Sequence, residues 1–143
     1  MTTTTVAERM GGARILRREV RSELDLADAV QAGLPMGAAE RVVREGVLTN
    51  TELHRLVIPR RTLAHRKGKG QRLTPEQSDR LARVVRVVAR SEEALGEPGR
   101  AFRWLRSPNR ALGGRAPLDL LDTDAGAHLV ERILVRLEHG VAS

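Results

Sequence analysis

The segment from Thr74 to Gly96 constrains the fold most, because it has the pattern of one long helix with both ends marked. Thr74 can cap the first turn, Pro75 suits the first helical position, and Gln77 stands where a capping box takes Glu or Gln. Apolar side chains then recur at helical spacing over about five turns. They are Leu81, Val84, Val85, Val88 and Leu95. The segment predicts an amphipathic helix, and Gly96 predicts its end.

The shortage of aromatic residues also favours helices. The chain of 143 residues has one Trp, one Phe, no Tyr and no Cys, so its core has to be built from Leu, Val, Ile and Ala. Such a core suits helix packing better than a β-sandwich, where aromatic and β-branched residues dominate. The absence of Cys excludes disulfides, thiolate nucleophiles and Cys-ligated zinc. The predicted fold class is all-α, a small helical bundle of one ordinary domain or two small ones.

Outside this segment the sequence predicts shorter helices, each ended by glycine or proline. Residues 1–12 have no helical periodicity and are expected to be mobile. A weak pattern at Leu16, Val20, Leu24 and Ala27 predicts one helix that ends near residue 31. The other expected helices cover residues 38–45, 50–57, 59–67, 100–105, 117–121 and 123–139, the last with Leu129, Val130, Ile133, Leu134 and Leu137 at helical spacing. No segment predicts a strand.

The net charge of +7 is distributed unevenly along the chain. Residues 53–75 carry seven basic side chains and no acid, and residues 101–117 carry four arginines and no acid. Residues 118–143 are acidic on balance, with five acidic and two basic side chains. The first basic block indicates an anionic partner, although a solvated basic loop is the plain alternative. Four arginines at helical spacing, Arg80, Arg83, Arg86 and Arg90, are expected to form a solvated helix face.

Residues 48–63, with the sequence LTNTELHRLVIPRRTL, resemble the helix-turn-helix of Xre-type regulators. In that family Glu-Leu lies in the first helix and Arg-Thr-Leu in the second. The second helix of such a motif enters the major groove with its early residues facing the base edges. Arginine can read guanine bidentately, and threonine can meet the thymine methyl group. The resemblance therefore implies a DNA-binding set of Arg60, Arg61, Thr62, His65, Arg66, Lys67 and Lys69, with Lys67, Lys69 and Arg72 at phosphates.

The motif departs from the family pattern at two positions. His54 stands where a small Ala is common, and Val57 replaces the Gly that is often found at the turn. Two interpretations therefore stay open. The two helices bind operator DNA, or they only complete the bundle and help the chain to dimerise.

The stretch from Trp104 to Gly126 resembles the toxin-binding domain of the Xre/MbcA/ParS antitoxins. Their shared pattern reads approximately W-L-x-x-P-N-x-x-L-x-G-x-x-P-x-x-L-L-x-T-x-x-G. The residues in register are Trp104, Leu105, Pro108, Asn109, Leu112, Gly114, Pro117, Leu120, Leu121, Thr123 and Gly126. The resemblance covers about residues 34–143. It implies a flexible N-terminus (1–13), an Xre-like DNA-binding and dimerisation domain (14–96) and a C-terminal toxin-binding domain (97–143).

The same resemblance implies a partner, an enzyme of the RES type that consumes NAD or transfers ADP-ribose and whose active site the antitoxin blocks. The residues expected to touch this toxin are Trp104, Asn109, Arg132, Arg136, His139, Gly140 and Ser143. Two interpretations of Trp104 stay open. In the first, this large aromatic residue beside a turn is an interface anchor. In the second, Trp104 and Phe102 are both core residues of a small helical domain. Pro108, Asn109 and Gly114 are expected mainly to set the shape of the backbone.

No pattern typical of catalysis or of cofactor binding occurs in the sequence. The four histidines lie in different predicted elements and have no metal-ligand spacing with carboxylates, and Gly68-Lys69-Gly70 is too short for a P-loop. We therefore expect no enzyme activity, no cofactor and no metal. No apolar run reaches the length of a membrane span, and the N-terminus has no signal-peptide pattern, so a cytoplasmic location is expected.

Three hypotheses for function remain. The first is an antitoxin that neutralises a RES-type toxin and, as a homodimer within a larger toxin–antitoxin assembly, represses its own operon. The second is an antitoxin of the same family that binds its toxin but not DNA. The third is a small basic transcription regulator without a toxin partner.

Overall fold

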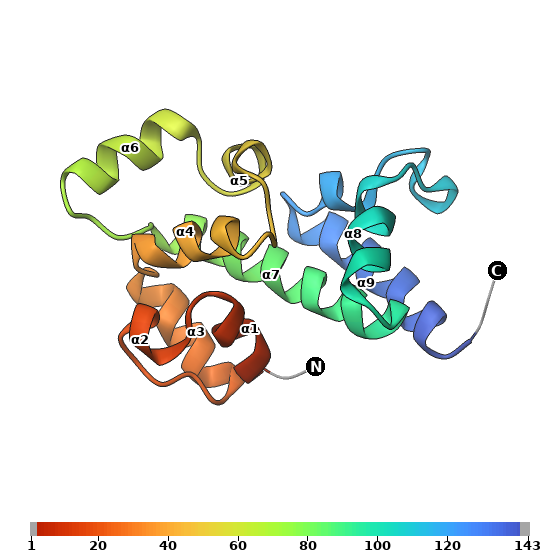
Figure 1. The fold of residues 1–143 in the computed structure, drawn as a ribbon, viewed down its shortest axis with the longest axis horizontal. Helices are drawn as coiled ribbons and strands as arrows, with labels where there is room; N and C mark the ends of the chain where they lie inside the picture. Colours follow the sequence, from red (N-terminus) through yellow and green to blue (C-terminus); the bar gives the residue numbers. More distant parts are fainter. Residues whose placement is uncertain (1–2, 141–143) are drawn as a thin grey trace. The chain divides into compact units, whose positions relative to one another are not determined.

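A computed structural model describes residues 3–140, and in these residues the chain forms helices and no strand (Figure 1). The all-α prediction is therefore confirmed. The chain divides into two compact units, an N-terminal unit that extends to Val85 and a C-terminal unit that begins at Arg86. The division lies inside helix α7 (Pro75–Leu95), which contributes residues to both units. The sequence analysis expected the domain boundary after residue 96, just beyond this helix.

The N-terminal unit contains six helices before α7. They are α1 (Thr3–Arg9), α2 (Gly12–Leu16), α3 (Glu23–Ala32), α4 (Met36–Arg44), α5 (Asn50–Leu56) and α6 (Arg60–Gly68). Helix α2 packs against α1 and α4, α1 also contacts α3, and α4 contacts α5. The largest fully buried side chains of this unit are aliphatic or Met, as the composition requires; among them are Met10, Leu16, Leu34, Leu48, Ile58, Leu73 and Leu81.

The start of the chain differs from the sequence prediction. Thr3–Arg9 is helical, and Val6, Ala7 and Met10 are buried, so these residues belong to the core. The single helix expected from about residue 16 to 31 is instead two helices. Arg17 ends α2 in the left-handed conformation with φ 61°, and Ser22 caps α3 by accepting a hydrogen bond from the Asp25 amide. Leu24 is 70% exposed, so the weak apolar pattern did not mark one buried face.

Helix α7 begins where the sequence predicted. The Thr74 hydroxyl accepts a hydrogen bond from the Gln77 amide, and the Gln77 side chain accepts one from the Thr74 amide, which completes the capping box. The buried surface of the helix is wider than one face, since Ala82, Val87, Ala89 and Ser91 are buried in addition to four of the five predicted apolar positions. The fifth, Leu95 at the end of the helix, is only half-buried. A helix that is apolar on most sides is surrounded by protein. The buried Ser78 hydroxyl accepts a hydrogen bond from the Leu34 amide at 2.8 Å, which joins α7 to the segment between α3 and α4.

The C-terminal unit contains the end of α7 and four further elements. They are α8 (Pro98–Arg106), two short 3-10 helices, η1 (Arg110–Leu112) and η2 (Pro117–Leu120), and α9 (Asp124–Glu138). Element η2 packs against both α8 and α9. Thr123 caps α9 by accepting a hydrogen bond from the Gly126 amide at 3.0 Å. None of the helices in residues 3–140 has the length and apolar character that a membrane span requires.

Two arginines of the expected solvated face join α7 to α9 within the C-terminal unit. Arg86 pairs with Glu131 at 3.3 Å and Arg90 pairs with Glu138 at 2.8 Å. The side chains of Arg90, Glu131 and Glu138 are only about a quarter exposed. The face is therefore less solvated than the sequence suggested, because the acidic residues of the chain's C-terminal part lie opposite its arginines.

Gly126 marks a close backbone approach in the C-terminal unit. A Cβ atom at this position would overlap the carbonyl oxygen of Leu120, which is backbone and cannot rotate away. The absence of a side chain at Gly126 therefore lets the first turn of α9 lie directly against η2. This explains physically why a glycine stands at this place in the C-terminal motif.

We predict that Gly126→Ala destabilises the C-terminal unit by about 1–3 kcal/mol, because the new methyl group forces the two backbones apart. Trp104, the only tryptophan, lies in the same unit, so its fluorescence during urea unfolding measures the change. Gly99→Ala is the matched control, since its Cβ would make only ordinary contacts at 3.5 Å or more. Equal stability of the Gly126→Ala variant and the wild type would contradict this account of the packing.

Candidate functional site

Helix α6 lies on the surface and buries none of its residues (Figure 1). The side chains of Arg60, Arg61 and His65 are exposed, and Thr62 is half-buried. Within residues 3–140 neither Arg60 nor Arg61 has a side-chain hydrogen bond or an ion pair. The first turn of α6 therefore offers two guanidinium groups that are not engaged by any of the described residues. Such groups suit recognition of base edges or phosphates.

The C-terminal end of α6 is held by a hydrogen bond and an ion pair to neighbouring segments. The Arg66 side chain donates a hydrogen bond to the Arg72 carbonyl at 2.7 Å, and the Lys67 ammonium group pairs with Glu40 of α4. The Lys67–Glu40 pair is largely exposed and contributes little to stability. Lys69 is exposed just after the helix. The structure thus brings the predicted DNA-binding residues onto one helix and its C-terminal end, with Arg66 and Lys67 already in intramolecular contacts.

The two departures from the usual helix-turn-helix pattern both have a physical explanation. His54 Nδ1 lies 3.0 Å from the carbonyl oxygen of Ile58, so the imidazole ring bonds to the turn between α5 and α6. Val57 is buried and has φ −118°, a backbone conformation that does not require glycine. Thr49 and Glu52 form a full capping box at the start of α5. The turn is therefore well formed despite its unusual sequence.

The aromatic residues of α8 do not behave alike. Trp104 is half-buried, whereas the side chain of Phe102 is 46% exposed. The Arg106 guanidinium lies 3.7 Å from the centre of the Phe102 ring, a cation–π contact at the surface. The interpretation that both aromatic residues are core residues does not hold for Phe102. Leu105, which lies between Trp104 and Arg106 in the sequence, is the fully buried residue of this helix end.

Asn109 organises the loop that follows α8. Its amide donates a hydrogen bond to the Arg115 carbonyl at 3.1 Å, and its own carbonyl accepts from the amides of Leu112 and Gly114. The Asn109 side chain accepts from the Ala111 amide at 3.0 Å and so caps η1. These four bonds close the loop over residues 109–115. Asn109 therefore has a structural role, whatever else it contacts.

The remaining residues predicted to touch a toxin lie on α9 and just after it. Arg132 and Arg136 are exposed one turn apart, and His139 and Gly140 are exposed where the helix ends. Ser143 lies outside the described residues. Arg132 also lines a shallow cavity of about 260 Å³ together with Arg90, His128, Glu131 and Val135. The predicted set is therefore divided between α9 and the α8–η1 region, which carries Trp104 and Asn109.

Two apolar residues of α9 are exposed, and one of them, Leu129, was expected on the buried face. Leu129 is 43% exposed although its spacing placed it on the buried face, and Val135 is 37% exposed. More than half of the residues of α9 are apolar, so the periodicity alone does not show which of these side chains are exposed to solvent. Within residues 3–140, His, Asp and Glu side chains form no group of three or more that could hold a metal ion.

Comparison with known proteins assigns both units. The family model described as the antitoxin Xre-like helix-turn-helix domain matches residues 25–86. The model of the antitoxin Xre/MbcA/ParS C-terminal toxin-binding domain matches residues 90–140. An antitoxin Xre from Yersinia enterocolitica is 36% identical over 120 residues, which cover 82% of this chain and 81% of the relative. The chain belongs to the Xre antitoxin family.

Further relatives agree with this assignment. An antitoxin Xre from Pseudomonas putida is 34% identical over 122 residues, which cover 85% of this chain and 76% of the relative. A protein from Sphingobium named Prs ADP-ribosylating antitoxin is 33% identical over 88 residues, 55% of each chain. The chain is thus the antitoxin of a toxin–antitoxin system, with a helix-turn-helix domain followed by a toxin-binding domain. The first matched range ends at residue 86 and the second begins at residue 90. Both positions lie inside α7, close to the division between the two compact units.

Proposed function

We propose that this antitoxin binds a RES-type toxin that consumes NAD or transfers ADP-ribose, and that it occludes the active site of this toxin. We propose further that it represses its own operon by binding operator DNA as a homodimer. It acts by binding and not by catalysis. The observation that supports this function best is the agreement between the two matched families and the two compact units, one with an open basic helix and the other with an open face on α9.

The toxin-binding part of the proposal relies on the C-terminal unit. The candidate contacts are Trp104, Asn109, Arg132, Arg136, His139, Gly140 and Ser143. Arginine is enriched in binding hot spots. Arg132 and Arg136 share α9 with the exposed Leu129 and Val135. The name of the Sphingobium relative associates that antitoxin with ADP-ribosylation, which supports a toxin of this chemistry for the present chain.

The DNA-binding part of the proposal relies on α6. Arg60, Arg61, Thr62 and His65 would face the base edges, and Arg66, Lys67 and Lys69 would contact the sugar–phosphate backbone. A single unit of this size buries too little surface for tight operator binding. Two half-sites bound by a dimer, as in other helix-turn-helix repressors, would supply the missing affinity.

We predict that the double substitution Arg60→Ala with Arg61→Ala abolishes retardation of the antitoxin's own promoter in a gel. Each arginine–guanine pair contributes about 1–3 kcal/mol, so the loss of two weakens binding by at least about tenfold. Binding of the toxin by this variant should be unchanged, because both residues lie in the N-terminal unit. Retardation as strong as that of the wild type would remove α6 from the reading surface.

We predict the reciprocal result for Arg132→Glu with Arg136→Glu. This variant should lose about 2 kcal/mol or more of toxin affinity, because hot-spot arginines contribute on that scale. Titration calorimetry with the purified toxin encoded next to the antitoxin measures the change, and retention of promoter binding shows that the variant is folded. Full toxin affinity in the variant would move the interface away from α9. If the wild type binds no such toxin, the chain would instead act as a DNA-binding regulator without a toxin partner.

A further inference from the structure

A cavity of about 240 Å³ lies in the N-terminal unit, away from the base-reading turn of α6. The sequence brings three separate segments to it: the turn after α2, the end of α3 with the residues that follow it, and the chain after α6. The residues that line it include Leu16, Arg17, Arg18, Ala29, Leu34 and Arg72. Leu16, Ala29 and Leu34 are buried and form an apolar base, while the three arginines supply the charge.

The charge at this cavity is of one sign, since none of the lining residues is acidic. Within residues 3–140, Arg17 and Arg18 form no ion pair and no side-chain hydrogen bond. The pKa of the Asp25 carboxyl group is lowered chiefly by a hydrogen bond from the Arg21 backbone, and the charge of Arg18 contributes the least of the effects that lower it. Arg18 therefore remains available to another anion.

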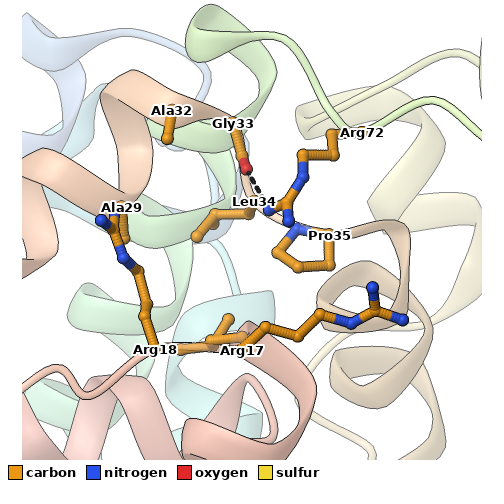
Figure 2. Close-up of a pocket in the computed structure, with 9 residues that line it drawn as sticks. Arg17, Arg18, Ala29, Ala32, Gly33, Leu34, Pro35 and Arg72 are labelled. Carbon is orange, nitrogen blue, oxygen red and sulfur yellow. Dashed lines mark hydrogen bonds between the residues drawn. The ribbon is translucent and has the colours of Figure 1, made fainter.

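The three guanidinium groups do not converge on one point. Figure 2 shows the Arg17 and Arg18 side chains leaving neighbouring positions in different directions, with Arg72 on the opposite side of the cavity. Arg72 donates a hydrogen bond to the Gly33 carbonyl at 3.1 Å, which holds its head group at the rim. A spread of positive charge around a rim suits successive phosphates of an extended polyanion better than one small ion.

The cavity is also connected to α6. The Arg72 carbonyl accepts the hydrogen bond from the Arg66 side chain, and the Gln71 amide donates to the Arg66 carbonyl at 2.9 Å. Only three residues separate Arg72 from the end of α6. The exposed Lys67 and Lys69 therefore lie in the short stretch of chain between the base-reading turn and the cavity rim.

Arg17 has an unfavourable backbone conformation for its residue type. It is the only non-glycine residue among those described with a positive φ, and a helix C-terminus in this conformation usually carries glycine. An arginine at a position where glycine would relax the backbone suggests a use for its side chain. The exposed guanidinium at the cavity supplies that use.

We infer that the cavity formed by Arg17, Arg18 and Arg72 binds backbone phosphates of duplex DNA beside the segment that α6 reads. The inference rests on the proposed DNA binding and extends it to a second surface of the N-terminal unit. The contacts are to phosphodiester groups, so they add affinity and fix the position of the protein on the duplex without reading sequence.

The test compares the wild type with the full-length variant Arg17→Gly, Arg18→Gln. Fluorescence anisotropy with a labelled promoter duplex is measured at several salt concentrations. Loss of two phosphate contacts should reduce the slope of log K against log salt by about 2, at a thermal unfolding midpoint equal to or above that of the wild type. Arg14→Gln is the control, because Arg14 is an exposed arginine of α2 that does not line the cavity, and the slope of this variant should equal that of the wild type.

The other outcomes are distinguishable. A wild-type slope in the double variant, while Arg60→Ala with Arg61→Ala loses promoter binding, overturns the cavity contact and leaves operator binding intact. No binding of the wild type to any duplex overturns both. Free inorganic phosphate is tested separately by its effect on the unfolding temperature. Stabilisation of the wild type alone by millimolar phosphate, with an unchanged DNA slope, would assign the cavity to a free anion and overturn the DNA contact.

Discussion

The close approach of α9 to η2 at Gly126 is the constraint on which the C-terminal unit depends. A core made of Leu, Val and Ala has little volume per side chain, so its backbones have to come close to leave no voids. Gly126 permits this approach against the Leu120 carbonyl, and Thr123 fixes the start of α9 at the same place. Asn109 closes the preceding loop with four hydrogen bonds. Together these residues hold α8 and α9 against η2 and leave the outer face of α9 exposed.

The N-terminal unit uses a different arrangement. Its core lies under α1 to α5 and the first half of α7, while α6 buries no residue and is bonded to neighbouring segments at its C-terminal end through Arg66 and Lys67. A helix that contributes so little to the core is free to carry charge, and Arg60 and Arg61 have no partner within the described chain. The two units also differ in charge. Basic residues gather at α6 in the N-terminal unit, whereas acidic residues of α9 in the C-terminal unit form ion pairs with arginines of α7.

Much of this was predictable from local signals. The capping box of Thr74 and Gln77 predicted the start of α7, and glycine or proline predicted the ends of the shorter helices, because these signals depend only on neighbouring residues. The N-terminal helix and the exposure of Leu24, Phe102 and Leu129 were not predictable, since they depend on which sides of a helix find a partner. The cavity lined by Arg17, Arg18 and Arg72 was also not predictable from the sequence, because the fold brings together residues more than fifty positions apart.

We propose that DNA and toxin are bound by separate units of one chain. Hydrogen–deuterium exchange of the full-length antitoxin, measured alone, with promoter duplex and with toxin, tests this most directly. The account predicts that DNA slows exchange in α6 and around residues 66–72, and that toxin slows exchange in α9 and the loop over residues 107–116. Protection of α6 by the toxin, with none in α9, would contradict the account.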